Sequence, residues 1–298
     1  MTLRRYALVR TAWQVGVLFV FFSLAYVVAW VVPKEPLGHD PGYGGFLRDL
    51  TRGSLGRSAG LQPGNVGPSV RSVMWDASWV TISFLLVTGV FAVSLGALLA
   101  FVTIRAPRVR PAVRGIGLVF VSLLPIWTGL YLAFYLGADW HVIRFGGYCP
   151  LRATPAYDCH GLRAWLSSLL LPAIALGIYF GAIYGRWLAA SFRHGKTEYH
   201  RALEEGRDHA KARRGVRRRH GLAFAKLLSR DFAFALGFGA FVETVFGLPG
   251  LGNTVVITAF GNAPLMAGAL VAASVLAAAL VFVVDIVCAA IDPRFRWF

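Results

Sequence analysis

The chain has 298 residues, 57% of them hydrophobic before its 33 glycines are counted, and a mean hydropathy of +0.61. A soluble domain is usually about 45–50% apolar even with glycine included, and the excess here forms nearly uncharged runs of about 18 residues or more, which argues against a soluble protein. The net charge of +16 is better explained by basic loops of a membrane protein than by a nucleic-acid partner, so we expect no nucleic acid.

Six apolar runs predict membrane-spanning helices. The first follows a short basic N-terminus and is too long for the apolar region of a signal peptide, so we expect it to be retained. Backbone groups in lipid must pair within their own segment, and the alternating pattern of a membrane barrel is absent, so we expect α-helices. The predicted spans are residues 13–32, 78–104, 115–137, 166–189, 232–259 and 264–290. The chain is thus predicted as all-α, with a single transmembrane domain over residues 1–298.

Lysine and arginine predict how this domain is oriented. They gather before the first span, in the loop at 105–114, in the loop at 193–230 and in the last five residues. With six spans, all four segments lie on one side of the membrane, and basic residues favour the cytoplasmic side. We therefore expect both termini and the 193–230 loop to be cytoplasmic, and the loops at 33–77 and 138–165 to be external.

The external loops carry few structural signals. The 33–77 segment is rich in Gly and Pro, and its stretch from 38 to 45 predicts turns, with room for a short interfacial helix later in the segment. The second loop holds Cys149 and Cys159. Outside the cytoplasm these two thiols could form a disulfide, and the alternative is two free thiols.

Three glycines recur at every fourth position of the fourth span: Gly177, Gly181 and Gly185. This spacing lines one helix face with small residues and favours a close helix–helix contact. The spacing does not say whether the contact lies within the chain or with a partner subunit.

Catalytic and cofactor-binding patterns are missing from the sequence. Gly195-Lys196-Thr197 has the ending of a phosphate-binding loop, but Ala190 stands where that loop needs its first glycine. The four histidines of the 193–230 loop lack a metal-ligand spacing with nearby Cys. We expect no enzyme activity, cofactor or metal in this chain, and any ATP hydrolysis to occur in a separate subunit.

Two polar segments remain as candidates for function. Residues 198–219 are basic and contain good helix formers, which predicts short helices at the membrane surface, held either by anionic lipid or by a cytoplasmic partner. The second segment begins with Glu243 inside an apolar run and continues through a Gly/Pro-rich stretch that we expect to break or bend the helix. An acid at membrane depth marks either a transport path or a structural pair with a cation or the backbone, and Asp285 has the same ambiguity.

These segments also carry a resemblance to a known family. The matching stretches, in order, are residues 53–58 (GSLGRS), Glu198-Tyr199 with Arg201-Ala202, Arg219-His220, residues 242–252 (VETVFGLPGLG) and residues 292–295 (DPRF). The chain resembles the permease of binding-protein-dependent ABC importers, specifically the first permease of the dipeptide, oligopeptide and nickel group. The similarity extends over nearly the whole chain.

The resemblance implies a type I ABC importer permease that forms half of a translocation path for peptides or similar small solutes. It implies four kinds of partner: a second homologous permease, cytoplasmic ATPase subunits, an external substrate-binding protein and the lipid of a prokaryotic inner membrane. The ATPase-coupling residues that it implies are Glu198, Tyr199, Arg201, Ala202, Gly206 and Ala210, and the path or gate residues are Glu243, Phe246, Pro249, Gly250 and Gly252. A stand-alone secondary transporter is the alternative function, which an internal repeat or several paired intramembrane charges would favour.

The chain departs from the family pattern in two places. About three extra residues separate Tyr199 from the Arg219-His220 pair, so the usual glycine of the motif falls on Gly206 when counted from the start and on Ala210 when counted from the end. The first external segment is shorter than usual and has residues 33–36 (PKEP) in place of a Gly-Asp-Pro.

Overall fold

The structure is a computed structural model that describes residues 2–31, 42–59, 66–106, 108, 110–112, 115, 118–119, 125–135, 147–151, 159–259 and 262–292. Helices make up most of this part of the chain. The elements, in order, are α1 (Leu3–Tyr26), the π-helical turn η1 (Val27–Val31), α2 (Gly42–Thr51), β1 (Arg57–Ala59), β2 (Val66–Ser69), α3 (Val70–Arg105), α5 (Pro125–Leu132), α6 (Leu162–Glu204), α7 (His209–Val245), α8 (Leu251–Thr258) and α9 (Ala263–Ile291).

Four helical segments in the described residues are long and apolar enough to cross a membrane: Leu3–Val31, Val70–Arg105, Leu162–Glu204 and Ala263–Ile291. The predicted all-α, multi-pass membrane protein is therefore confirmed. Of the predicted span at 115–137, the structure describes residues 115, 118–119 and 125–135, and Pro125–Leu132 among them form α5. In the predicted span at 232–259 the Gly/Pro-rich stretch does break the helix, because the chain leaves α7 after Val245 and resumes a helix only at Leu251.

Helix α6 is the most buried of the four long apolar helices. In its most apolar stretch 61% of the residues are buried, against 28% in each of α1 and α3 and 11% in α9. Its neighbours α3 and α7 complete the largest apolar core, in which Phe84 of α3 and Leu176 of α6 are fully buried beside Val242 of α7. The large apolar side chains that remain exposed on α1, α3 and α9 match the lipid-facing surface of a membrane helix.

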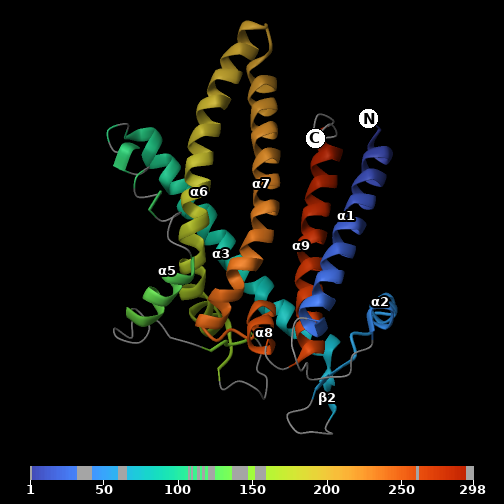
Figure 1. Cartoon of the computed structure of the whole chain (residues 1–298). Coiled ribbons are helices and arrows are strands. Elements are labelled where there is room, and N and C mark those ends of the chain that lie inside the picture. Colours follow the sequence, from blue (N-terminus) through green and yellow to red (C-terminus); the bar gives the residue numbers. More distant parts are fainter. Residues whose placement is uncertain are drawn as a thin grey trace.

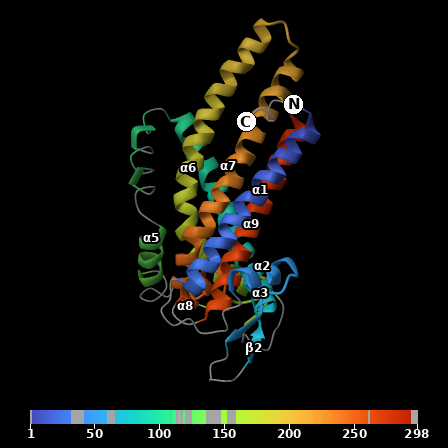
Figure 2. The same ribbon diagram turned by 45° about the vertical axis from the view of Figure 1, so that its right-hand side comes forward.

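Helices α1 and α9 lie side by side in both views (Figures 1 and 2). Small residues on each, including Ala25 and Ala267, let the two backbones approach closely in a second apolar cluster. Figure 1 shows the start of α1 and the end of α9 at the same end of the bundle, where α6 and α7 extend beyond them. Helices α6 and α7 form a two-helix hairpin there, so we call this the hairpin end.

The segment after α1 differs from its prediction. Residues 42–45, predicted as turns, form the first turn of α2, because Phe46 is buried against the rings of Tyr26 and Trp30 at centroid distances of 5.7 and 5.6 Å. The predicted later helix is absent from the described residues of this segment, which instead pair β1 with β2 in antiparallel fashion. Helix α3 then begins at Val70, eight residues before the predicted start at 78.

Candidate functional site

The glycine stripe of α6 faces α3 of the same chain. A Cβ atom on Gly181 would lie 2.8 Å from Leu95 Cδ2, and one on Gly185 would lie 2.9 Å from Leu99 Cβ. A Cβ on Gly177 would meet the ring of Phe91 at 2.6 Å. The three predicted packing residues therefore allow a close contact between two helices of the same chain. The spacing alone did not say whether the partner helix belonged to this chain or to another subunit.

The end of α7 is a sharp, fully hydrogen-bonded turn. Gly247 has a φ of +63°, which a residue with a side chain rarely adopts. Its N–H donates to Thr244 O at 3.2 Å, and the N–H of Leu248 donates to Glu243 O at 2.8 Å. This pattern is a Schellman motif, which satisfies the last carbonyls of a helix. Leu248 then enters the main apolar core and Pro249 prevents the helix from continuing.

The Glu243 carboxylate lies inside this break. Its side chain is only 1% exposed. Its Oε1 accepts a hydrogen bond from Thr81 Oγ1 at 2.7 Å, and its Oε2 accepts from the N–H groups of Gly252 and Asn253 at 2.8 and 3.1 Å. Thr81 Oγ1 in turn accepts from Leu251 N at 2.8 Å. The carboxylate of α7 thus caps the start of α8, where free N–H groups and the helix dipole favour a negative charge.

Two glycines of the break leave no room for a side chain. A Cβ on Gly250 would collide with the Glu243 carboxylate, and a Cβ on Gly252 would collide with the Cα of Ala240. Phe246, at the same break, is 2% exposed and accepts a hydrogen bond at its carbonyl from Gly147 N at 3.2 Å. The Gly and Pro residues thus allow α8 to fold back against the end of α7.

The structure brings all five predicted path or gate residues together at this break. The sequence left open whether Glu243 marks a transport path or forms a structural pair. Its contacts with the N–H groups of Gly252 and Asn253 are those of a structural pair with the backbone. The sequence analysis missed Thr81, which lies on another helix. Its only signal was a hydroxyl side chain within the apolar run at 78–104.

The basic loop at 193–230 is a two-helix hairpin. Helix α6 continues to Glu204, and α7 starts directly after Asp208, whose side chain accepts hydrogen bonds from the N–H groups of Ala210 and Lys211. The predicted short surface helices are therefore wrong: good helix formers on both sides of the turn extend the two long helices instead. Figure 1 shows the hairpin rising past the ends of α1 and α9.

Polar contacts join the two arms of the hairpin. Arg219 Nη1 donates to Glu198 Oε1 at 2.9 Å, and Tyr199 Oη lies 2.9 Å from His209 Nδ1. A groove of about 420 Å³ lies between the arms, and Arg201 and Ala202 are among its lining residues. Of the predicted coupling residues, Glu198, Arg201 and Ala202 line this groove, whereas Tyr199, Gly206 and Ala210 are not among its lining residues.

The two candidates for the motif's glycine have different conformations. Gly206 lies in the turn with a φ of +78°, whereas Ala210 lies in the first turn of α7. The left-handed conformation at position 206 favours glycine, whereas the helical conformation at position 210 accommodates an alanine.

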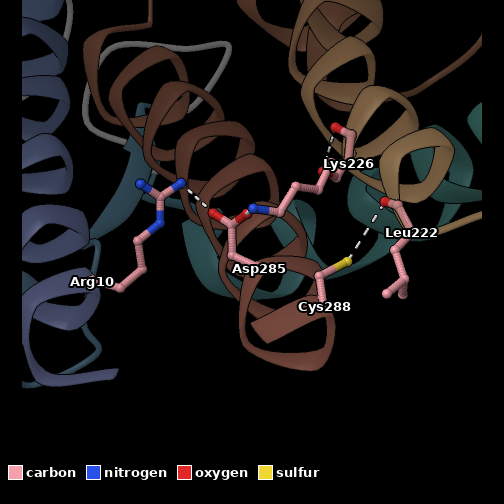
Figure 3. A network of polar contacts seen from close by, with 6 residues as sticks. Arg10, Leu222, Lys226, Asp285 and Cys288 are labelled. Atoms are coloured by element: carbon pink, nitrogen blue, oxygen red, sulfur yellow. Dashed lines mark hydrogen bonds and ion pairs between the residues drawn. The ribbon is translucent and has the colours of Figure 1, made fainter. Parts of the chain in front are cut away.

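A second intramembrane acid, Asp285, lies in α9 near the hairpin end. Its side chain is paired with Arg10 of α1, and its Oδ1 lies 3.5 Å from Lys226 Nζ of α7. Figure 3 shows the two cations reaching this carboxylate from different helices. Nearby, the thiol of Cys288 lies 3.7 Å from the carbonyl oxygen of Leu222 (Figure 3). The cluster ties α1, α7 and α9 together.

Cys149 and Cys159 form a disulfide in the structure, with Cα atoms 5.3 Å apart. The bridge lies just before α6, at the end of the bundle opposite the hairpin (Figure 1). The third cysteine, Cys288, is a free and buried thiol.

Known proteins resemble this chain over most of its length. A probable peptide ABC transporter permease protein of Sinorhizobium fredii is 24% identical over 261 residues, covering 85% of this chain and 79% of that protein. Putative peptide transport system permease proteins of Brucella abortus and Brucella melitensis are 24% identical over 263 residues, with the same coverage. No family model matches the chain. The resemblance carried by the motifs is confirmed, and the chain is a helical, multi-pass membrane protein related over most of its length to ABC-transporter permease proteins.

Proposed function

We propose that this chain is the membrane-spanning permease subunit of an ATP-driven importer and forms half of a path for peptides or similar small solutes. The similarity to peptide-transport permease proteins over 85% of the chain carries the proposal. In this function the chain binds no cofactor of its own, and a separate ATPase hydrolyses the ATP.

The hairpin is suited to receive a mechanical input. Helix α7 runs without interruption from the tip of the hairpin at His209 to Val245, which directly precedes the break. At about 1.5 Å per residue this helix is on the order of 55 Å long. A push on the basic tip would move Glu243 as part of this rigid helix, and the break that its carboxylate holds would follow. This continuity supports the hairpin as the ATPase contact and the break as part of the gate.

The proposed assembly has two permeases, cytoplasmic ATPase subunits and an external binding protein that delivers the solute. The hairpin end faces the cytoplasm of a prokaryote, with both termini on that side of the inner membrane. The concentration of lysine and arginine in the hairpin supports this orientation. The disulfide at the opposite end supports it too, because disulfides persist outside the cytoplasm.

Reconstitution in lipid vesicles tests the proposal. The chain is co-expressed with the second permease and the ATPase of its transport system, and ATP hydrolysis and solute uptake are measured with and without loaded binding protein. We expect hydrolysis to rise when loaded binding protein is added, and uptake to require ATP. Uptake by this chain alone, driven by an ion gradient without ATP, would show a secondary transporter instead.

A further inference from the structure

Two adjoining cavities lie between α1, α7 and α9 near the hairpin end. The first has a volume of about 640 Å³ and is lined by polar and charged residues that include Arg10, Lys226 and Arg230. The second has a volume of about 400 Å³ and is mostly apolar, with Val17, Phe21 and Leu270 among its lining residues. Arg10, Ala233 and Val281 line both, so the cavities form one continuous groove with a charged mouth and an apolar interior.

The mouth has an excess of positive charge. Its described lining includes three cations, Arg10, Lys226 and Arg230, and one carboxylate, Asp285, which pairs with Arg10 and Lys226. Arg230 Nε also lies 3.8 Å from Asp231 Oδ1, so the described cations around the mouth outnumber the described carboxylates by three to two. An anionic oxygen in the mouth would pair favourably with this excess of cations.

The depth of the groove matches one leaflet of a bilayer. Arg10 at its mouth and Phe21 in its interior are eleven residues apart on α1, a rise of about 16 Å. The hydrocarbon core of a bilayer is about 30 Å thick, so this rise spans about half of it. The charged mouth lies toward the hairpin end and the apolar interior lies toward the middle of the bundle. A phospholipid has the same arrangement of a charged group followed by an apolar one, with its phosphate at the interface and its acyl chain below it.

We propose that the groove between α1, α7 and α9 binds one anionic phospholipid from the leaflet at the hairpin end. Its phosphate contacts Arg10, Lys226 and Arg230, and one acyl chain lies along Val17, Phe21 and Leu270. The lipid would stabilise the contact between the α1–α9 pair and α7, the helix that carries the hairpin. A neutral phospholipid offers the same chain without the net negative charge, so the site selects by headgroup.

Native mass spectrometry of the purified full chain tests the site. The protein is incubated with equal concentrations of phosphatidylglycerol and phosphatidylcholine, and the retained lipid is counted. We expect one phosphatidylglycerol in preference to phosphatidylcholine. Arg230→Gln should lower the phosphatidylglycerol affinity about fivefold, the effect of removing one basic contact. Its side chain is 70% exposed, so the fold should tolerate the change, and Arg214→Gln on the hairpin is the charge-matched control.

A second pair of variants tests the acyl chain without changing charge. Ala277 lines the apolar interior, whereas Ala279 on the same helix is exposed and does not. Ala277→Phe should fill the groove and reduce phosphatidylglycerol binding, and Ala279→Phe should leave it unchanged. Excess inorganic phosphate should not displace the lipid, because it lacks the chain.

Four results would overturn the proposal. They are equal retention of the two lipids, equal binding by each variant and its control, displacement by inorganic phosphate, and loss of the lipid when the second permease is present. The last result would assign the groove to a helix of the partner. These measurements use no ATP and no transport, so they stand apart from the test of the proposed function.

Discussion

Thr81 of α3 donates a 2.7 Å hydrogen bond to Glu243 of α7, although the two residues are 162 positions apart in the sequence. The same hydroxyl accepts a hydrogen bond from the N–H of Leu251 at the start of α8. Thr81 and Glu243 together connect three helices at a point where the backbone leaves the helix. Broken helices occur at membrane depth where other groups of the protein satisfy their backbone, and these two side chains do so here.

Removing the carboxylate should destabilise the break. Glu243→Ala leaves the buried N–H groups of Gly252 and Asn253 without their acceptor, and each unsatisfied donor costs about 1–3 kcal/mol. We expect a clearly lower thermal midpoint in detergent. The control is Glu204→Ala, which removes an exposed acid from the hairpin and should leave the midpoint nearly unchanged.

The close approach at Gly252 should not tolerate a methyl group. In Gly252→Ala the new Cβ would meet the backbone of Ala240, which cannot rotate away, so we expect a loss of about 1–3 kcal/mol in the free energy of unfolding. Gly237→Ala, in α7, adds the same methyl group where no atom lies within 4 Å. Equal stability of the two variants, measured by thermal unfolding, would contradict the contact.

A matched pair on α3 tests the α3–α6 contact. Gly96→Ala would place Cβ 2.8 Å from Tyr184 Cβ and 3.2 Å from Gly181 O, so the helices must separate at a cost of about 1–3 kcal/mol. Gly89→Ala, two turns earlier on the same helix, meets no atom within 4 Å. Thermal unfolding should show a lower midpoint for the first variant only. A result in which both variants match the native protein would place the contact elsewhere.

The hairpin should matter for coupling more than for stability. Glu198→Ala removes an exposed ion pair with Arg219, which contributes about 0–1 kcal/mol, so the thermal midpoint should change little. Under the proposed function, the variant should lose solute uptake while the assembled complex still hydrolyses ATP. Full uptake by this variant and by Tyr199→Ala would show that the ATPase contact lies elsewhere. Glu204→Ala, also on the hairpin, is the charge-matched comparison.

The bridge between Cys149 and Cys159 encloses a short loop of the chain, with a sequence separation of 10. In the chain-entropy account, such a bridge adds about 2–3 kcal/mol to the free energy of unfolding. A reductant should therefore lower the thermal midpoint of the native protein, but not that of the Cys149→Ala/Cys159→Ala variant. A thiol reagent applied to the unreduced, denatured chain should label only Cys288. Labelling of all three cysteines would contradict the bridge.

The apolar runs predicted the membrane helices well because burial in lipid depends on composition over about 20 residues, which a sequence shows directly. The last predicted span, 264–290, matches α9 within one residue at each end. The hairpin was harder to predict. Its polar composition indicated helices, but their length and direction depend on the antiparallel contact between α6 and α7, which includes the pair of Glu198 and Arg219.

The sequence by itself determined that this chain crosses a membrane and which motifs it shares with ABC permeases, because hydropathy and local strings need no knowledge of contacts. Tertiary structure alone decided that the glycines of α6 face α3, that Glu243 caps α8, and that Arg10 pairs with Asp285. The first and last of these are contacts between residues far apart in the chain, and the second joins two helices across a break. Their distances depend on how the helices pack, and no local pattern encodes that packing.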